Sequence, residues 1–132
     1  MSPSRLPAVT RGLLAAGALG TLAALVYAAG GMDAFRAGAL GFVLWALFPY
    51  GVLAVALPRF WSARARMAGL AGTAAIVVGA LALYADALWL HPDAQGALAF
   101  VFVPVVQLAV AAGTLGLAWL LHRRRDAAAP TA

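Results

Sequence analysis

The sequence contains no cysteine and no lysine, and its serines all lie outside its long apolar stretches. Without cysteine, the chain can form no disulfide, thiol redox centre or thiolate metal site. Without lysine, it cannot hold a retinal-type Schiff base. No apolar stretch contains a serine nucleophile or a pair of aspartates, which argues against common intramembrane protease chemistry. His91 and His122 are expected at opposite ends of the molecule, which argues against haem held by both within one chain. These absences predict a protein that is not an enzyme and has no cofactor.

Charge is also scarce, and its spacing divides the chain into membrane spans. Only 10% of the residues are charged and 65% are hydrophobic, whereas soluble proteins carry about 25% charged residues. Each of the long charge-free stretches can cross hydrocarbon, which takes about 20 helical residues. In lipid the backbone must pair its polar groups internally, so these stretches are expected to be helical. The sequence predicts an all-α integral membrane four-helix bundle, one domain over residues 1–132, with spans at 11–31, 37–58, 67–88 and 96–121.

The arginines predict the orientation of these spans. All but Arg36 fall before the first span, between the second and third, or after the fourth. Short loops that carry arginine stay in the cytoplasm, so both termini are expected there. Heavy use of alanine, glycine and arginine without lysine fits a GC-rich bacterial genome, and the expected location is the bacterial inner membrane. The net charge of +5 is interpreted as topology signalling and attraction to membrane lipids, not nucleic-acid binding, because no basic stretch is long enough for the latter.

The first span has a second interpretation. Arg5 and Arg11 precede an apolar run that ends in Val26-Tyr27-Ala28, an arrangement compatible with a cleaved signal peptide. The run is long for a signal peptide, which favours a spanning helix. Both interpretations stay open here.

The two halves of the chain resemble each other. Matching positions are 12–13 with 69–70, 27–28 with 84–85, and 38–43 with 96–101. Such a duplication predicts two parallel-repeat helical hairpins, related by an axis along the membrane normal in a pseudo-symmetric bundle. Because alanine, glycine and leucine are so common in this chain, chance similarity is the alternative.

Small residues recur at every fourth position in the first and third spans. Such stripes let helix backbones approach closely in membranes, so they are expected to be the faces by which these helices meet their neighbours. The stripes are Gly12, Ala16 and Gly20, and Ala71, Ala75 and Gly79.

Candidate site residues fall at one depth in the second and fourth spans. Pro49 and Pro104 each remove an amide donor from a helix, and Tyr50 and Gln107 add hydrogen-bonding side chains nearby. Paired helix interruptions near the membrane centre often mark substrate sites in transporters. The pattern predicts a ligand or permeation site between helices two and four. The simpler alternative is ordinary proline kinks and a glutamine bonded to a neighbouring helix, worth about 0.6 kcal/mol.

A second polar cluster is expected on the outer face. Its members are Asp33, Asp86, His91 and Asp93. Carboxylates and imidazole can bind a divalent cation, but this spacing matches no established ligand pattern. Solvated loop polarity is the favoured interpretation, and no metal site is predicted.

One stretch is similar to a known group of proteins. Asp93-Ala94-Gln95 followed by Phe-Val-Phe-Val-Pro-Val-Val-Gln at 100–107 resembles part of small, uncharacterised four-helix inner-membrane proteins of Gram-negative bacteria. The resemblance covers one helix and its loop, and implies location and topology but no substrate. Small multidrug transporters have a similar length, but they carry an acidic residue in the first helix, which is absent here.

Together these patterns favour a non-enzymatic membrane component that docks on a membrane-protein partner or on a second copy of itself. Two other functions stay open. The chain could be a transporter or channel subunit with its site between helices two and four, or a sensor or immunity-type protein that acts through its outer loops.

Overall fold

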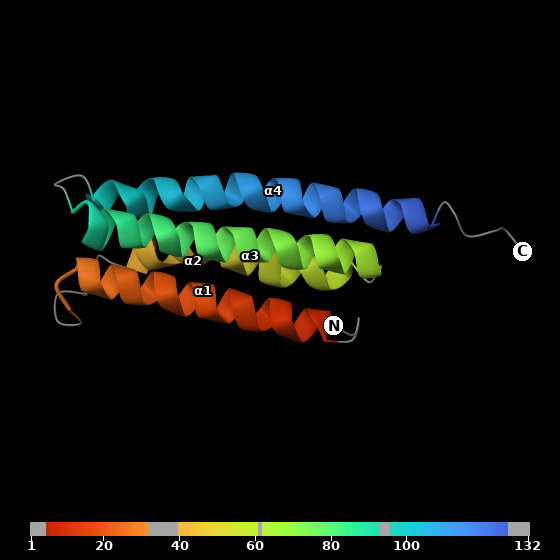
Figure 1. Cartoon of the computed structure of the whole chain (residues 1–132), viewed down its shortest axis with the longest axis horizontal. Helices are drawn as coiled ribbons and strands as arrows, with labels where there is room; N and C mark the ends of the chain where they lie inside the picture. The colour runs from red at the N-terminus through yellow and green to blue at the C-terminus, as the bar shows by residue number, and fades with distance from the viewer. Residues whose placement is uncertain (1–4, 32–39, 61, 93–95, 127–132) are drawn as a thin grey trace, which may run out of the picture.

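The chain forms a bundle of four long helices. The computed structural model describes residues 5–31, 40–60, 62–92 and 96–126. The helices are α1 (Leu6–Ala28), α2 (Leu40–Ala56), α3 (Ala63–Ala85) and α4 (Ala99–Asp126), joined by the short turns η2 (Leu57–Arg59), η3 (Asp86–Leu90) and η4 (Gly96–Leu98). Four helical segments, α2 with η2 and α3 with η3 included, are long and apolar enough to cross a membrane. They lie along one common axis (Figure 1). The predicted all-α membrane bundle is confirmed.

Two helices extend past the spans expected from charge. α1 begins at Leu6, before residue 11, and α4 continues to Asp126, past residue 121. An arginine can remain in a helix while its long side chain carries the guanidinium group to water. Charge therefore marks where a helix leaves hydrocarbon, which is not where the helix ends.

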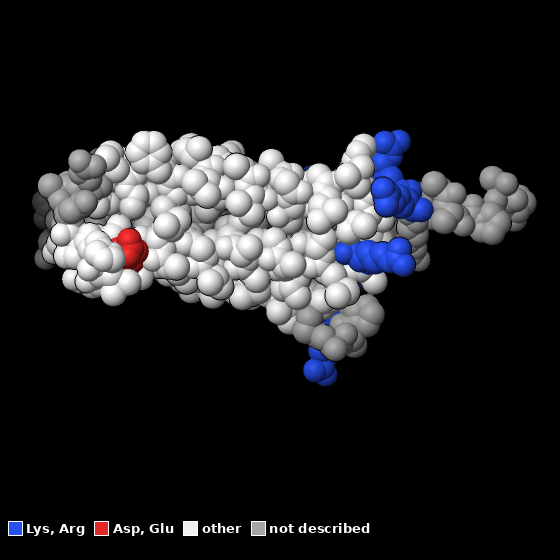
Figure 2. All heavy atoms as spheres, turned by 45° about the horizontal axis from the view of Figure 1, so that its top comes forward, with Lys and Arg blue, Asp and Glu red and all other residues white. Residues whose placement is uncertain are grey.

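Charge separates the two ends of the bundle. The described arginine side chains gather at one end, here called the arginine end, and Figure 2 shows an acidic side chain toward the other end. This other end, here called the aspartate end, carries Asp86 and His91 in and after η3. α1 and α3 begin at the arginine end, and α2 and α4 return to it.

The hairpin of α1 and α2 lies beside the hairpin of α3 and α4, and α1 and α3 run in the same direction. α1 packs against α2 and α3, α4 packs against the same two helices, and the diagonal pairs make far sparser contact. In Figure 1, α1 and α4 lie at opposite edges with α3 between them. A twofold axis along the membrane normal would instead place α1 diagonally opposite α3. The expected pseudo-twofold arrangement is therefore wrong, and the fold gives no support to an internal repeat.

Glycines explain why α1 and α3 are neighbours. A Cβ atom at Gly17 would lie 2.7 Å from Val77 Cγ2, and one at Gly20 would lie 2.7 Å from Leu81 Cδ2. Real Cβ atoms do not approach other atoms so closely, so only glycine allows these side chains of α3 to contact the α1 backbone. Such close approach is one of the sources of helix association in lipid, with hydrogen bonds between helices and lipid entropy.

The predicted packing stripes face mainly outward. Gly20 packs on Leu81, but the other five members, Gly12, Ala16, Ala71, Ala75 and Gly79, are exposed. The prediction that these stripes pack α1 and α3 inside the bundle is wrong. The buried faces instead carry threonine, at positions Thr10, Thr21 and Thr73, because a hydroxyl costs more than a methyl group to expose to hydrocarbon.

Candidate functional site

Three polar side chains from three helices meet inside the bundle. Gln107 Nε2 of α4 donates a hydrogen bond of 2.8 Å to the Tyr50 hydroxyl of α2. The same hydroxyl shares a 2.9 Å hydrogen bond with Thr21 Oγ1 of α1. All three side chains are buried. We call Thr21, Tyr50 and Gln107 the polar layer.

The polar layer lies between two apolar clusters. The cluster toward the aspartate end contains Ala24, Leu25, Ala46, Ala80, Tyr84, Phe100 and Val103. The other contains Leu14, Leu53, Ile76, Val77 and Ala111, together with the Tyr50 ring. On each of α1, α2 and α4, the polar residue falls between members of the two clusters. Apolar side chains thus enclose the layer on both sides, where a polar group without a partner is costly.

Gly17 makes room for the layer. A Cβ atom at this position would lie 2.8 Å from Tyr50 Cε1. The Tyr50 ring therefore packs directly against the α1 backbone, one helical turn before Thr21. Sequence reasoning missed both Gly17 and Thr21, although threonine in a spanning helix is a known hydrogen-bonding residue between helices.

The two candidate prolines lie beside this layer. Pro49 and Pro104 are almost fully buried within α2 and α4. One turn nearer the aspartate end, Trp45 Nε1 of α2 donates a 3.2 Å hydrogen bond to the Val101 carbonyl oxygen of α4. The Phe100 carbonyl oxygen, one residue earlier in α4, lacks its usual helical donor because Pro104 has no amide N–H. The prediction that these positions share one depth agrees with the direct Tyr50–Gln107 bond.

The layer retains an unused acceptor. Gln107 Oε1 is buried and has no hydrogen-bond partner among the described residues, as is also true of Thr73 Oγ1 and the Tyr84 hydroxyl. The Tyr84 ring stacks on the Phe100 ring with centroids 4.7 Å apart. Packing therefore holds the Tyr84 side chain in place without a hydrogen bond to its hydroxyl. A buried amide oxygen without a partner can accept a hydrogen bond from a water molecule or from a ligand donor.

The outer polar cluster is only partly visible. His91 Nδ1 and Asp86 Oδ1 lie 2.8 Å apart, and both side chains are exposed. Asp33 and Asp93 lie outside the described residues. Within the described part of the chain, no three acidic or histidine side chains are grouped as a metal site requires. The structure therefore brings two of the four candidates together, on the exposed surface of the aspartate end.

Comparisons of the chain with models of protein families, with curated proteins and with solved structures find no match. No family is therefore identified, and the resemblance at residues 93–107 gains no support. The function has to be inferred from the geometry of the bundle.

Proposed function

We propose that this multi-pass membrane protein is a non-enzymatic component that associates with another membrane helix, from a partner protein or from a second copy. The observation that carries this proposal is the outward direction of a stripe of small residues on α3. Ala71, Ala75 and Gly79 are all exposed, and a Cβ atom at Gly79 would meet nothing within 4 Å. We call these three residues the small-residue face.

The small-residue face suits association better than contact with lipid. Two larger, exposed side chains adjoin it: Val78 beside the row, 66% exposed, and Met67 at its end, 62% exposed. The face is thus a row of small side chains next to the larger, exposed Val78. Lipid tails are as apolar as leucine, so helices associate in membranes through close packing, for which small residues spaced by four are suited.

Photo-crosslinking in the native membrane tests this association. A photoreactive side chain at Val78 is expected to give a discrete adduct with a partner or second copy. Gly79→Leu should remove most of that adduct, because its larger side chain keeps another helix from approaching the α3 backbone closely. Gly51→Leu is the matched control, since Gly51 of α2 is also exposed with open space around it. Equal adduct yields in both variants would argue against the small-residue face.

We also propose that the arginine end faces the cytoplasm of a bacterial inner membrane. The proposal follows from the gathering of the described arginine side chains at this end (Figure 2) and from the retention of short arginine-bearing loops in the cytoplasm. Because the chain has no cysteine, single substitutions report orientation cleanly. A membrane-impermeant maleimide should label His91→Cys in intact cells and Arg64→Cys only after lysis. The reverse pattern would overturn the orientation.

A transporter or channel subunit is the second candidate function. It is favoured by the unpartnered Gln107 Oε1 in the polar layer, which could bind a small donor. This function requires that Gln107→Leu abolish a flux while the amount of folded protein is unchanged. A fully active Gln107→Leu variant would exclude the polar layer as the transport site.

A further inference from the structure

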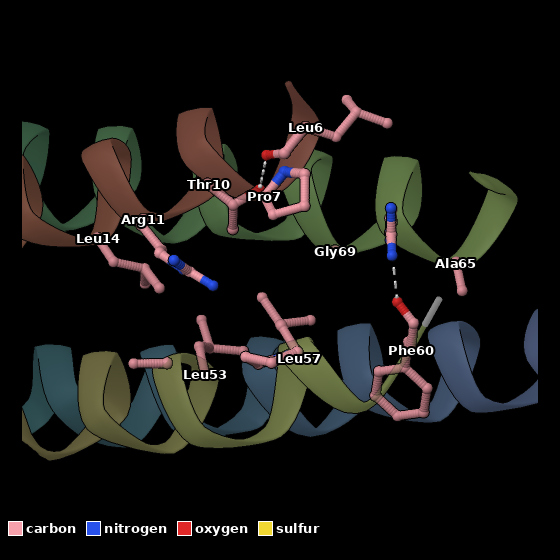
Figure 3. Close-up of a pocket in the computed structure, with 13 residues that line it drawn as sticks. Leu6, Pro7, Thr10, Arg11, Leu14, Leu53, Leu57, Phe60, Ala65 and Gly69 are labelled. Atoms are coloured by element: carbon pink, nitrogen blue, oxygen red, sulfur yellow. Dashed lines mark hydrogen bonds between the residues drawn. The ribbon is translucent and has the colours of Figure 1, made fainter. Parts of the chain in front are cut away.

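A pocket of about 170 Å³ lies at the arginine end, away from the polar layer. Three segments form it: the first turns of α1, the end of α2 with η2, and the first turns of α3 (Figure 3). Its apolar lining includes Leu14, Leu53 and Leu57, and two arginines also line it, Arg11 and Arg66. In Figure 3, the Arg11 guanidinium group points from α1 toward Leu53 and Leu57.

The charges at this pocket are not neutralised by the described chain. Arg66 Nε donates a 3.4 Å hydrogen bond to the Phe60 carbonyl oxygen, drawn as a dashed line in Figure 3. The other four N–H groups of that guanidinium remain available. Arg11 forms no hydrogen bond or ion pair with any other residue that the structure describes.

Helix ends add to this positive potential. The N-termini of α1 and α3 both border the pocket, and neither has an acidic residue in its first turn. A helix N-terminus carries a partial positive charge that favours an anion. The positive potential of these two helix ends adds to the charge of Arg66, and no acidic side chain in either first turn balances it.

We propose that this pocket binds one anionic phospholipid from the adjoining leaflet, with its phosphate on Arg11 and Arg66 and part of one acyl chain against the leucines. The pocket lies where the helices leave hydrocarbon, so headgroup and chain reach it together. Its volume is close to the roughly 150 Å³ of an apolar cavity that holds benzene, which suits a short part of a chain. Basic pockets between membrane helices bind anionic headgroups, whereas a soluble anion would leave the leucine lining unused.

Native mass spectrometry of the full-length protein tests the lipid site. The protein is equilibrated with phosphatidylglycerol or with phosphatidylcholine of the same chains. The wild type should retain one phosphatidylglycerol per chain, preferred by about tenfold or more, since each arginine near an anionic lipid contributes to binding. The double variant Arg11→Gln/Arg66→Gln should lose this preference.

Arg64→Gln is the matched control, because Arg64 is exposed on the same turn of α3 but does not line the pocket. This variant should keep the wild-type preference. Equal retention of both lipids by the wild type would overturn the site, as would the same loss in Arg64→Gln. Displacement of the lipid by millimolar inorganic phosphate would assign the arginines to a soluble anion and overturn the lipid proposal.

Discussion

Gly72→Ala is expected to destabilise the bundle by about 2 kcal/mol, within the usual range for overpacking a well-packed interior. A Cβ atom at Gly72 of α3 would lie 2.1 Å from Thr114 Oγ1 and 2.3 Å from Thr114 Cγ2 of α4. Thr114 cannot easily move away, because its hydroxyl donates a 2.8 Å hydrogen bond to the Val110 carbonyl oxygen. The two helices would have to separate locally to admit one methyl group.

Gly51→Ala provides the control for this prediction. Alanine is favoured over glycine in a helix by about 1 kcal/mol, and position 51 is exposed with open space for a Cβ atom. This variant should therefore be as stable as the wild type or more so. The comparison is made by reversible unfolding in mixed micelles. If Gly72→Ala proves as stable as Gly51→Ala, the described contact between α3 and α4 is wrong.

Tyr50→Phe is expected to cost about 1 to 3 kcal/mol of folding free energy. The substitution keeps the ring but removes the hydroxyl that bonds both Gln107 and Thr21. Two buried polar groups then lose their partner, and an unsatisfied buried group costs roughly this much. Tyr27→Phe is the control, because Tyr27 is exposed at the aspartate end and should change stability by less than about 0.5 kcal/mol.

A double-mutant cycle separates the Tyr50–Gln107 bond from other effects of Tyr50→Phe. Removing both partners of a buried hydrogen bond is less harmful than removing one. Tyr50→Phe combined with Gln107→Leu should therefore destabilise less than the sum of the single changes, by about 0.6 to 1.7 kcal/mol as for other membrane helix pairs. Strict additivity would show that the two side chains do not interact.

The polar layer connects stability with the two candidate functions. The two hydrogen bonds of this layer fix the register of α1, α2 and α4, because only one register aligns Thr21, Tyr50 and Gln107. Such a role needs no ligand and agrees with an associating component. A transported ligand would have to compete with these bonds or use the free Gln107 Oε1, so the Gln107→Leu variant separates the two functions by its effect on flux.

The sequence predicted four membrane-spanning helices and a shared depth for Tyr50 and Gln107, for physical reasons that also limit what it can predict. Charge is so costly in hydrocarbon that the arginines and aspartates alone divide the chain into four apolar spans. A fixed rise per residue predicted that Tyr50 and Gln107 share a depth. Their partner Thr21 was missed, because a single threonine in an apolar helix gives no periodic signal.

Helix orientation around its own axis was harder to predict. Both the lipid-facing and the buried faces of a membrane helix are apolar, so the stripe of Ala71, Ala75 and Gly79 was assigned to the wrong side. Helix neighbours were also uncertain, since short loops fix only the pairs α1 with α2 and α3 with α4. The pocket beside Arg11 and Arg66 is formed by three segments distant in sequence, and it can be found only after they are packed.

The central claim is that this bundle associates with another polypeptide in its membrane. Native mass spectrometry of the protein, gently extracted from its own membrane, tests that claim most directly. We expect the chain to be found with a second copy or a different polypeptide at a fixed ratio, and Gly79→Leu to release it. A protein found only as an isolated monomer under conditions that preserve other membrane complexes would contradict the account.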